Sequence, residues 1–356
     1  MRIAPHALLI GGNALALVLL AGCPPTLSAP RGEAHLDAMA EASRHHAHGR
    51  DEEAIASWDE AARTAERRVD RDEAEWRAAL ELRRAGRLDE ARARFDAIAA
   101  RRPISRRTVR ARFEVGRILL EQGARDEALA VLRDLCLSHP GDGPASRALA
   151  IVVGELEERD PAALESFLRE LDERVASTDL HDDALTHLAE LLRRRGDREG
   201  ARAAYERIVT LHPYPHGQRW DDTFMRLADM AEEDGDPRAA IRYLERMIEV
   251  HAHGIRPGSY TLPLMPEAAT RMAHLWRDAL GDWERAAAVY RAAYDRFDTS
   301  RSRDDWLVEL GELLVAHDRQ AEGCETLRRA TREFDAGSAV RRAREVLASA
   351  CASSSE

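Results

Sequence analysis

A short pattern recurs along the chain at nearly even spacing: a glycine, a polar turn, and an alanine five residues after the glycine. Clear copies of this pattern begin at Gly49, Gly86, Gly123, Gly196, Gly235 and Gly281. Weaker copies at 158 and 317 fill the gaps, so that consecutive copies lie 35 to 46 residues apart. A period of this length is typical of a stack of similar units, in which each unit buries its apolar face against its neighbours.

The residues around each turn predict a pair of helices. A large apolar residue follows the alanine by four positions, which places both on one face of a helix. A leucine recurs near the end of the segment that precedes the turn. In three copies a proline ends the segment that follows the turn. We therefore expect the glycine to cap a first helix, the alanine to lie where two helices cross, and the proline to end the second helix. The large residues are Trp58, Phe95, Leu132, Phe167, Tyr205, Leu244 and Tyr290; the leucines are Leu82, Leu119, Leu192 and Leu314; the prolines are Pro103, Pro140 and Pro213.

This arrangement resembles the tetratricopeptide repeat, a helix–turn–helix unit of about 34 residues. The resemblance covers His35 to Phe334 and implies an all-α fold, a right-handed α-solenoid of about eight such hairpins. The tryptophan near the start of each family unit is mostly missing, Gly116 is one of few matches to the first-helix glycine, and the fourth and eighth copies are degenerate. We predict the array at residues 35–336, a capping helix at 337–351 and a disordered tail at 352–356.

The longest interval between copies contains an insertion at residues 251–266, HAHGIRPGSYTLPLMP. Its prolines and glycines exclude a regular helix. The insertion is either a loop folded onto its own scaffold or a contact for a partner or a second copy.

The first residues have the pattern of a bacterial lipoprotein signal. An apolar run, too short to span a bilayer, ends at Leu20-Ala21-Gly22-Cys23 and is followed by two prolines. This resembles a lipobox and implies a signal peptide at 1–22, acylation of Cys23, and an extended tether at 23–34. Pro24 in place of aspartate favours the outer membrane under the sorting rule for such proteins, with the array facing the periplasm. The alternative is an ordinary cleaved signal and a stray cysteine.

Composition and motifs exclude several function classes. The chain has 53 basic and 64 acidic residues, a net charge of −11, which argues against nucleic acid and against lying flat on anionic lipid. Every cation is arginine, so no lysine base or P-loop lysine exists. No common catalytic motif is present, and we expect no cofactor. The histidines have no converging ligand pattern, so we expect no metal; they are His35, His45, His46, His48, His251 and His253.

Three cysteines remain beside Cys23. Cys324 and Cys351 lie at similar distances on either side of Gly337, where two antiparallel helices would turn, so they are candidates for a disulfide. We expect Cys136 to be a buried thiol. The alternative is that all three are unpaired small apolar residues.

A tetratricopeptide array binds ligands in the groove lined by its first helices, and the turn alignment gives the groove positions in this chain. A basic and aromatic region is expected in units two and three and an acidic one near unit six. Arginine beside aromatic residues suits extended peptides and carboxylates, whereas the alternative is that Trp76 and Phe113 pack between units. The candidate partner-binding residues are Trp76, Arg83, Arg84, Arg110, Phe113 and Arg117; further groove positions are Glu190, Arg193, Arg194, Met225, Asp229, Glu232 and Glu233.

These features together predict a lipid-anchored, non-catalytic scaffold that binds a protein or peptide partner at the cell envelope. The resemblance extends to lipoproteins that act in outer-membrane protein assembly or secretion. One alternative is a module that binds peptidoglycan or polysaccharide and recruits an envelope enzyme. Another is an enzyme with a pocket built from the histidine-containing insertion.

Overall fold

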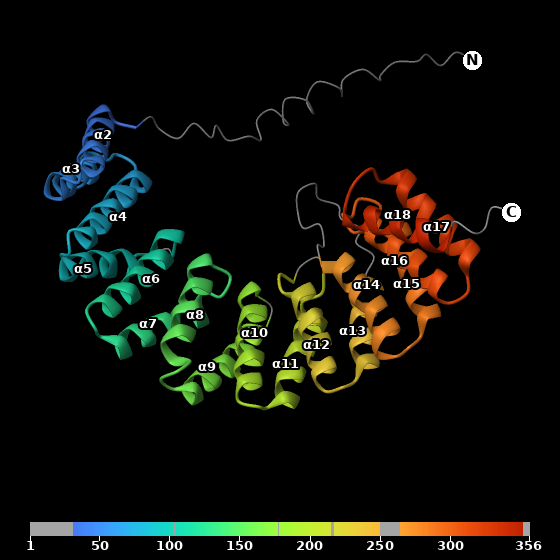
Figure 1. Ribbon diagram of the computed structural model, residues 1–356. Helices are drawn as coiled ribbons and strands as arrows, with labels where there is room; N and C mark the ends of the chain where they lie inside the picture. The colour runs from blue at the N-terminus through green and yellow to red at the C-terminus, as the bar shows by residue number, and fades with distance from the viewer. Residues whose placement is uncertain (1–30, 103, 177, 215–216, 250–263, 352–356) are drawn as a thin grey trace, which may run out of the picture. The chain divides into compact units, whose positions relative to one another are not determined.

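The computed structural model describes residues 31–102, 104–176, 178–214, 217–249 and 264–351 (Figure 1). Within these ranges the chain forms 17 α-helices and one π-helical turn, and no strand. In chain order they are α2 (Glu33–Ala47), α3 (Asp51–Thr64), α4 (Arg68–Arg84), α5 (Leu88–Ala99), α6 (Arg106–Glu121), α7 (Arg125–Ser138), α8 (Gly143–Leu156), α9 (Pro161–Arg174), α10 (Asp179–Arg194), α11 (Arg198–Leu211), α12 (Trp220–Glu233), α13 (Pro237–Glu249), α14 (Leu264–His274), η1 (Leu275–Ala279), α15 (Trp283–Arg296), α16 (Arg303–Ala316), α17 (Gln320–Glu333) and α18 (Ser338–Ala350).

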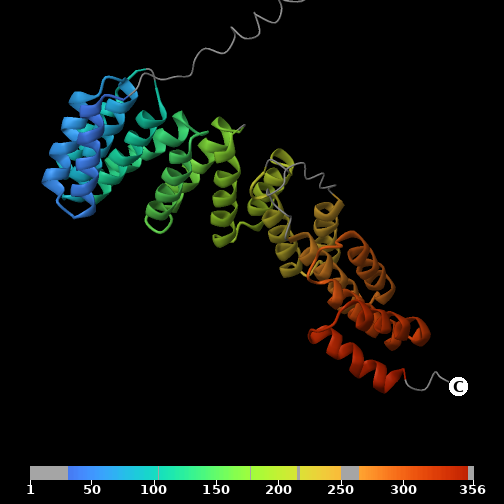
Figure 2. The same ribbon diagram turned by 90° about the horizontal axis from the view of Figure 1, so that it is seen from above.

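The chain divides into two compact parts, Met1–Leu135 and Cys136–Glu356, and each is described by itself. In the N-terminal part, α2 to α5 each pack against the next helix in the chain. In the C-terminal part the same holds from α8 onward, and α18 packs on both helices of the last hairpin, α16 and α17 (Figure 2). Helices α2 to α17 thus correspond to the eight predicted hairpins, and α18 to the predicted capping helix.

The predicted glycines do cap the first helices. Each has a left-handed backbone, with φ between 66° and 81°. At Gly86 the next amide, that of Arg87, donates to the carbonyl oxygen of Leu82 at 2.9 Å, and the Gly86 amide donates to that of Arg83 at 3.1 Å. This pair of bonds satisfies carbonyl groups that a helix end otherwise leaves open. The glycines are Gly49, Gly86, Gly123, Gly196, Gly235 and Gly281.

The predicted crossing alanines of the six clear copies are fully buried, at 0% exposure. The large residues four positions later are at most 3% exposed, and the first-helix leucines at most 4%. Each such side chain contributes roughly 1.5–3 kcal/mol by leaving water. The alanines of the six clear copies, the large residues and the leucines are therefore confirmed as packing residues by the structure. The alanines are Ala54, Ala91, Ala128, Ala201, Ala240 and Ala286.

The eighth unit turns one residue later than the sequence pattern suggested. Asp318, with φ 60°, takes the left-handed position, and the amide of Arg319 donates to the carbonyl oxygen of Leu314 at 2.9 Å. The crossing position is then Gly323, where a β-carbon would lie 2.7 Å from the carbonyl oxygen of Gly311. The helix crossing in this unit is too close even for alanine.

The fourth unit is also shifted by one residue. Asp160 caps α9 by accepting a hydrogen bond from the amide of Ala163 at 2.9 Å, as Asp197 caps α11 through Gly200. Counted from this cap, the crossing position is Leu164, which is 1% exposed, and not the predicted Ala163. A leucine there prevents the close approach that alanine allows, which explains why the pattern is weak in this copy.

The seventh unit contains the π-helical turn η1. The amide of Asp282 donates to the carbonyl oxygen of Trp276, one residue further back than in the other turns. The unit begins within the predicted insertion, because α14 starts at Leu264 and Met265 is buried. The final three residues of the predicted loop are thus helical, and residues 251–263 lie outside the described residues.

A disulfide joins the last hairpin to the capping helix. Cys324 in α17 and Cys351 at the end of α18 are bonded, with their Cα atoms 5.8 Å apart. Cys136 is a buried free thiol, and burial raises its pKa to about 12. The bond closes a loop between residues that are 27 positions apart at the end of the array. In the chain-entropy model, closing such a loop lowers the entropy of the unfolded chain and raises the free energy of unfolding by roughly 3 kcal/mol.

The lipobox and Cys23 lie outside the described residues, as does the tail at 352–356. Helix α2 begins at Glu33, so the last two residues of the predicted tether are helical. Among the helices that the structure describes, none is long and apolar enough to cross a bilayer.

The close crossing at Gly323 predicts that an alanine substitution there destabilises the fold, whereas an alanine substitution at a glycine with free space around it stabilises the fold. We expect Gly323→Ala to lower the free energy of unfolding by about 1–3 kcal/mol, because its β-carbon would meet backbone and side-chain atoms of α16. Gly154→Ala is the matched control within α8. Nothing lies within 4 Å of a β-carbon there, so better helix propensity should raise stability by about 0.5–1 kcal/mol. Urea titrations of both variants measure these changes, and the same sign for both would refute the assigned crossing.

Candidate functional site

The first helices of the later units carry charged residues three positions apart. In α12 these are Arg226, Asp229 and Glu232, which lie on one face of the helix. In each case the residue nearest the helix start pairs with residues of the preceding unit. Arg226 approaches Glu190 of α10, and Arg271 of α14 binds Asp229 and Glu232 of α12. This face of the first helices is therefore connected from unit to unit by ion pairs.

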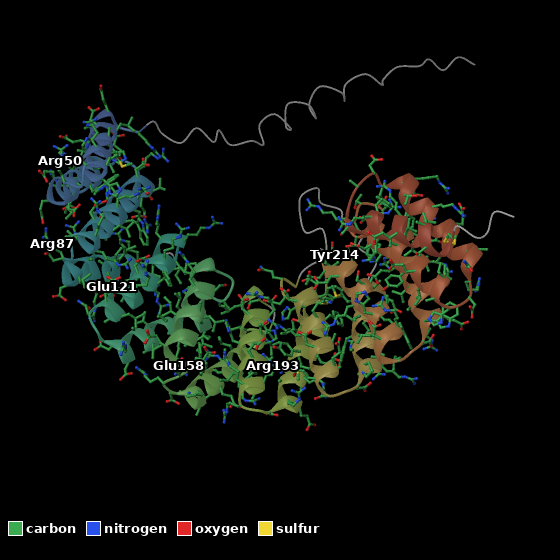
Figure 3. All side chains as sticks on the ribbon, viewed as in Figure 1. Arg50, Arg87, Glu121, Glu158, Arg193 and Tyr214 are labelled. Carbon is green, nitrogen blue, oxygen red and sulfur yellow. A yellow bond between two sulfur atoms is a disulfide. The ribbon has the colours of Figure 1, made fainter. Side chains whose placement is uncertain are left out.

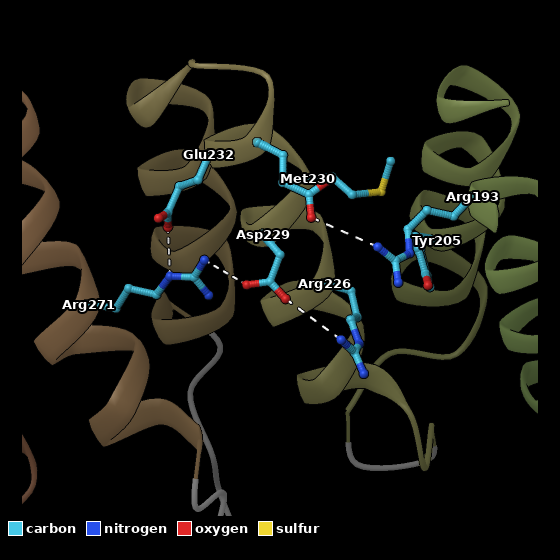
Figure 4. A pocket seen from close by; sticks show the side chains of 8 residues that line it. Arg193, Tyr205, Arg226, Asp229, Met230, Glu232 and Arg271 are labelled. Atoms are coloured by element: carbon cyan, nitrogen blue, oxygen red, sulfur yellow. Dashed lines mark hydrogen bonds and ion pairs between the residues drawn. The ribbon is translucent and has the colours of Figure 1, made fainter. Parts of the chain in front are cut away.

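A pocket of about 280 Å³ lies on this face within the C-terminal part (Figure 4). Helix α12 forms its floor, and α10, α11 and α14 contribute side chains from both sides. Three of its side chains are arginines, three are carboxylates, one is a tyrosine and one a methionine. The lining residues are Arg193, Tyr205, Arg226, Asp229, Met230, Glu232, Glu233 and Arg271.

Arg271 is fully engaged at one side of this pocket. Its Nε donates to Glu232 at 2.7 Å, and its Nη2 lies 2.7 Å from an oxygen of Asp229. Burial alone would lower the pKa of Arg271, but the two carboxylates raise it above its usual value. This arginine thus fixes α14 against α12 and is not available to a ligand.

Arg193 and Arg226 are held much less tightly. Arg193 lies 3.5 Å from Glu190 and 3.9 Å from Glu233, and its buried Nε has no hydrogen-bond partner among the described residues. Arg226 lies 3.8 Å from Glu190 and 3.9 Å from Asp229, and its side chain is 55% exposed. Contacts of this length are ion pairs without good hydrogen-bond geometry. Both guanidinium groups can therefore donate to an incoming carboxylate.

Tyr205 closes the base of the pocket. Its hydroxyl donates to Glu190 at 2.7 Å, and its ring is buried between α10 and α11. Burial, followed by the bond to Glu190, raises the pKa of Tyr205. The tyrosine thus stays neutral, and it orients the carboxylate that both weakly held arginines share.

Units seven and eight contain a similar cluster of a tyrosine, a glutamate and cationic side chains. Here the glutamate belongs to the following unit and the cations to the preceding one. Glu309 of α16 accepts from His274 Nε2 at 3.0 Å, from Arg277 Nη1 at 2.9 Å and from the Tyr290 hydroxyl. Burial would raise the pKa of Glu309, but the bonds from His274 and Tyr290 hold it at about 2. The boundary between α14 and α16 therefore has the cations on the preceding unit, whereas the boundaries on either side of α12 have them on the following unit.

The site predicted in the N-terminal part is corrected by burial. Trp76 is 6% and Phe113 4% exposed, so neither can contact a partner. Trp76 packs edge-on against Phe95 with ring centres 5.1 Å apart, inside the core of units two and three. The alternative interpretation, that these aromatic residues pack between units, is the one that the structure supports. The helical periodicity shows which residues share a face of the helix, but it does not show whether that face lines the groove or packs in the core.

The predicted arginines of this region are mostly paired within the chain. Arg83 binds Glu114 at 2.9 Å and also binds Glu121. These carboxylates, Glu121 above all, raise the pKa of Arg83. Arg84 binds Glu81 at 3.0 Å and also Asp51. Arg117 is 3.4 Å from Glu114 and stands over the Phe113 ring, whereas Arg110 is exposed. The structure does not assemble these residues into a pocket.

The expectation for units five and six fits the structure better. Four of its residues, Arg193, Asp229, Glu232 and Glu233, line the pocket, whereas Arg194 pairs with Glu157 and Met225 is half-buried. Sequence reasoning missed Tyr205, Arg226, Met230 and Arg271. The three-residue spacing in α12 could have found Arg226. Arg271 was hidden, because the π-helical turn moves it one residue further from its turn glycine.

The described residues contain no group of three histidine, cysteine, aspartate or glutamate side chains that could hold a metal ion. His45 and His46 pair with Glu41 and Glu81, and His35 is buried, not solvated as expected for the first helix, with Nδ1 bonded to the Ala61 carbonyl oxygen at 2.8 Å. His251 and His253 lie outside the part of the chain described.

A further histidine pair lies inside the C-terminal part. His181 is fully buried, and its Nε2 and Nδ1 are hydrogen-bonded to Asp172 at 2.8 Å and to His212 at 2.7 Å. Both ring nitrogens of His181 are thus used within the fold. The pair ties α9 and α10 to the end of α11 and offers no free atom to a ligand.

Family models of the tetratricopeptide repeat match residues 77–144, 225–301 and 277–339, and a second such model matches 183–213. Together they span more than half of the chain. The chain belongs to the tetratricopeptide repeat family. The all-α solenoid class expected from the sequence is the class of this family. Tetratricopeptide repeat proteins are in general non-catalytic scaffolds for protein–protein interaction.

Several solved tetratricopeptide repeat structures are similar to this chain. A tetratricopeptide repeat protein from Parabacteroides merdae is 15% identical, with 80% of this chain and 98% of that one covered and a TM-score of 0.35. PilF from Pseudomonas aeruginosa is 18% identical, with coverage of 67% and 96% and a TM-score of 0.33. The C-terminal part of a repeat protein from Cytophaga hutchinsonii is 14% identical, with coverage of 75% and 98% and a TM-score of 0.40. No curated protein sequence matches this tetratricopeptide repeat chain significantly.

The cluster around Glu309 predicts a pH-dependent loss of stability in this tetratricopeptide array. Because the folded-state pKa is about 2 and the ordinary value 4.5, ionised Glu309 stabilises the fold above pH 4.5, and this contribution disappears as the pH falls toward 2. We expect Glu309→Gln to cost roughly 2–3 kcal/mol at pH 7 and progressively less below pH 4.5. Urea unfolding at a series of pH values measures both. Glu267→Gln, at an exposed position in α14, should cost less than about 0.5 kcal/mol throughout. An equal cost at pH 7 and pH 3 for Glu309→Gln would contradict this assignment.

Proposed function

We propose that this protein is a non-catalytic scaffold that binds an extended, carboxylate-bearing segment of a protein partner in the groove formed by α10, α12 and α14. The observation that carries the proposal is the pair of weakly held arginines, Arg193 and Arg226, facing one pocket beside Tyr205. Arginine forks donate two parallel hydrogen bonds to a carboxylate, which gives geometric specificity as well as energy. The buried Tyr205 supports them from beneath, because its hydroxyl fixes the Glu190 carboxylate that both arginines approach.

The composition of the pocket argues against the polysaccharide alternative. A sugar site would be expected to present aromatic faces without an excess of charge. In this pocket six of the eight lining side chains are charged, and the one aromatic residue, Tyr205, is buried. The same charge pattern suits a peptide, whose backbone and side chains can match alternating positive and negative groups.

The proposed location is the periplasmic face of a bacterial outer membrane, with acylation of Cys23 as the anchor. Support comes from the Leu-Ala-Gly-Cys sequence after an apolar run and from Pro24. The disulfide between Cys324 and Cys351 fits an oxidising compartment outside the cytoplasm. A role in outer-membrane protein assembly or in secretion is the narrower form of this proposal.

Cys23→Ser tests the anchor. The variant should remain in the soluble periplasmic fraction, whereas the unchanged chain should float with membranes after a carbonate wash, because acyl chains give stable anchoring. Membrane fractionation with an antibody to the array measures this. A Cys23→Ser chain that still resists the carbonate wash would disprove acylation as the anchor.

Reversing the charge of Arg193 and Arg226 tests whether the groove binds the partner. With a photo-crosslinking residue at Met225, Arg193→Glu with Arg226→Glu should reduce partner capture at least about tenfold in native envelopes, since each reversal replaces an attraction by a repulsion. The melting temperature should change little, because neither arginine has a well-formed hydrogen bond to a carboxylate. Arg242→Glu is the matched control, as Arg242 is 65% exposed on the second helix of the same unit. Undiminished capture in the double variant would place the partner elsewhere on the array.

A further inference from the structure

We infer that one edge of the N-terminal part, where α2, α4 and α6 begin, docks on an anionic phospholipid surface. This edge consists of residues 31–37, 63–72 and 101–107, without Pro103. The inference rests on the proposed acylation of Cys23, which would keep the edge close to a bilayer. It goes beyond that proposal, in which the acyl chains are the sole contact with lipid.

Exposed apolar side chains are concentrated at this edge. Among the described residues, four large hydrophobic residues are exposed, and three of them are here: Leu36 at 44%, Val69 at 59% and Ile104 at 53%. The fourth, Leu211, lies in the C-terminal part at 49%. A cluster of exposed apolar residues on one side of a domain is typical of an interaction surface, whereas a single one is ordinary.

Hydrogen bonds and ion pairs show that the three stretches are neighbours. Arg31, ahead of α2, lies 3.3 Å from Asp70 at the start of α4. Arg68 of α4 donates to the carbonyl oxygen of Arg102, between α5 and α6, at 3.2 Å. The apolar residues therefore stand on adjacent elements of one edge and can meet the same surface.

The same stretches are basic, although the whole chain is acidic. They contain nine arginines and five carboxylates, and three more carboxylates just outside them, Glu60, Glu73 and Glu75, pair with their arginines; the chain as a whole has a net charge of −11. Beyond a Debye length of about 8 Å the carboxylates elsewhere in the chain are largely screened at physiological ionic strength. An approaching bilayer thus responds mainly to the local charge of this edge, and not to the net charge of the protein.

Two of the four arginines around Ile104 have no carboxylate partner among the described residues. Arg102 donates to the carbonyl oxygens of Ala100 and Arg101, and Arg106 is exposed; within the described ranges neither pairs with an acid. In contrast Arg101 and Arg107 turn toward acidic residues of α4. The inward arginines are neutralised, and the two outward ones remain positive on either side of an apolar side chain. This is the pattern of residues that bind the interface of an anionic membrane.

The short chain segment between an acylated Cys23 and the edge would allow weak contacts with lipid to hold the edge on the membrane. Arg31 follows Cys23 by eight positions, which at about 3.5 Å each allows a reach of at most about 28 Å. A group held on so short a tether experiences an effective concentration in the millimolar range. A few exposed apolar side chains and unpaired arginines then suffice to hold the edge on lipid, and they fix how the N-terminal part faces the membrane.

A fluorescent label at the edge tests this directly. Ile104→Cys in the full-length chain adds a thiol that can be labelled with an environment-sensitive dye, because Cys136 is buried and Cys324 is bonded to Cys351. The labelled protein is reconstituted in vesicles of phosphatidylcholine alone or of phosphatidylcholine with one quarter phosphatidylglycerol. We expect the emission to shift to shorter wavelength in the anionic vesicles only. Arg102→Glu with Arg106→Glu should weaken this response about tenfold or more, since each arginine near a charged bilayer contributes several-fold in affinity.

Leu211→Cys, the fourth exposed apolar position, is the matched control, and its label should not respond to lipid charge. Equal emission from labels at 104 and 211 in anionic vesicles would overturn the inference, and Val69→Cys checks that result at a second edge position. Failure of the anchor is seen separately. Dye on the tryptic peptide that contains Cys23 would show that this thiol is not acylated. The edge is then tested in a Cys23→Ser background, where the shift at 104 should persist at higher concentrations of anionic vesicles.

Discussion

The structure depends on the close crossing of two helices at one small residue in each unit. Six of the eight units use a fully buried alanine at this point, and the large side chain four residues later fills the space beside it. The two remaining units show the limits of this design. Leu164 occupies the position in unit four and separates the helices, whereas Gly323 in unit eight brings them closer than any alanine could. Repetition of the same contact lets a chain with few aromatic residues form an extended array without a single large core.

A second constraint connects the units to one another. Residues three apart on the first helices place a charge of one sign opposite charges of the other sign on the preceding unit, as Arg271 does with Asp229 and Glu232. Charged side chains project from helices in both parts (Figure 3), but most exposed pairs of this kind contribute little to stability. The pairs in the groove differ because several are half-buried and share hydrogen bonds with a tyrosine. The pocket forms where this pairing is incomplete, at Arg193 and Arg226.

Sequence reasoning found the features that repeat and missed those that do not. The turn glycines, crossing alanines and large packing residues were predictable, because each is the same solution to the same local problem. The assignment of Trp76 and Phe113 to a groove was wrong, since a helix in an array is buried on more than one side and periodicity does not name the side. Arg271 could not be placed, because a π-helical turn changes the count of residues without leaving a mark in the sequence. The pairing of Cys324 with Cys351 followed from their equal distance to a turn, but the rotation of the two helices was visible only in the structure.

The bond between Cys324 and Cys351 has a consequence for how the protein is made. A linear array opens from its ends, and the capping helix is one of those ends. Since Cys351 follows the entire array, the bond can form only after every repeat has been synthesised. Until that moment the capping helix is held on the last hairpin by non-covalent contacts alone, among them the ion pair between Arg342 and Glu312. A covalent link at the end of the array is thus available only to a chain whose last hairpin and capping helix have already come together.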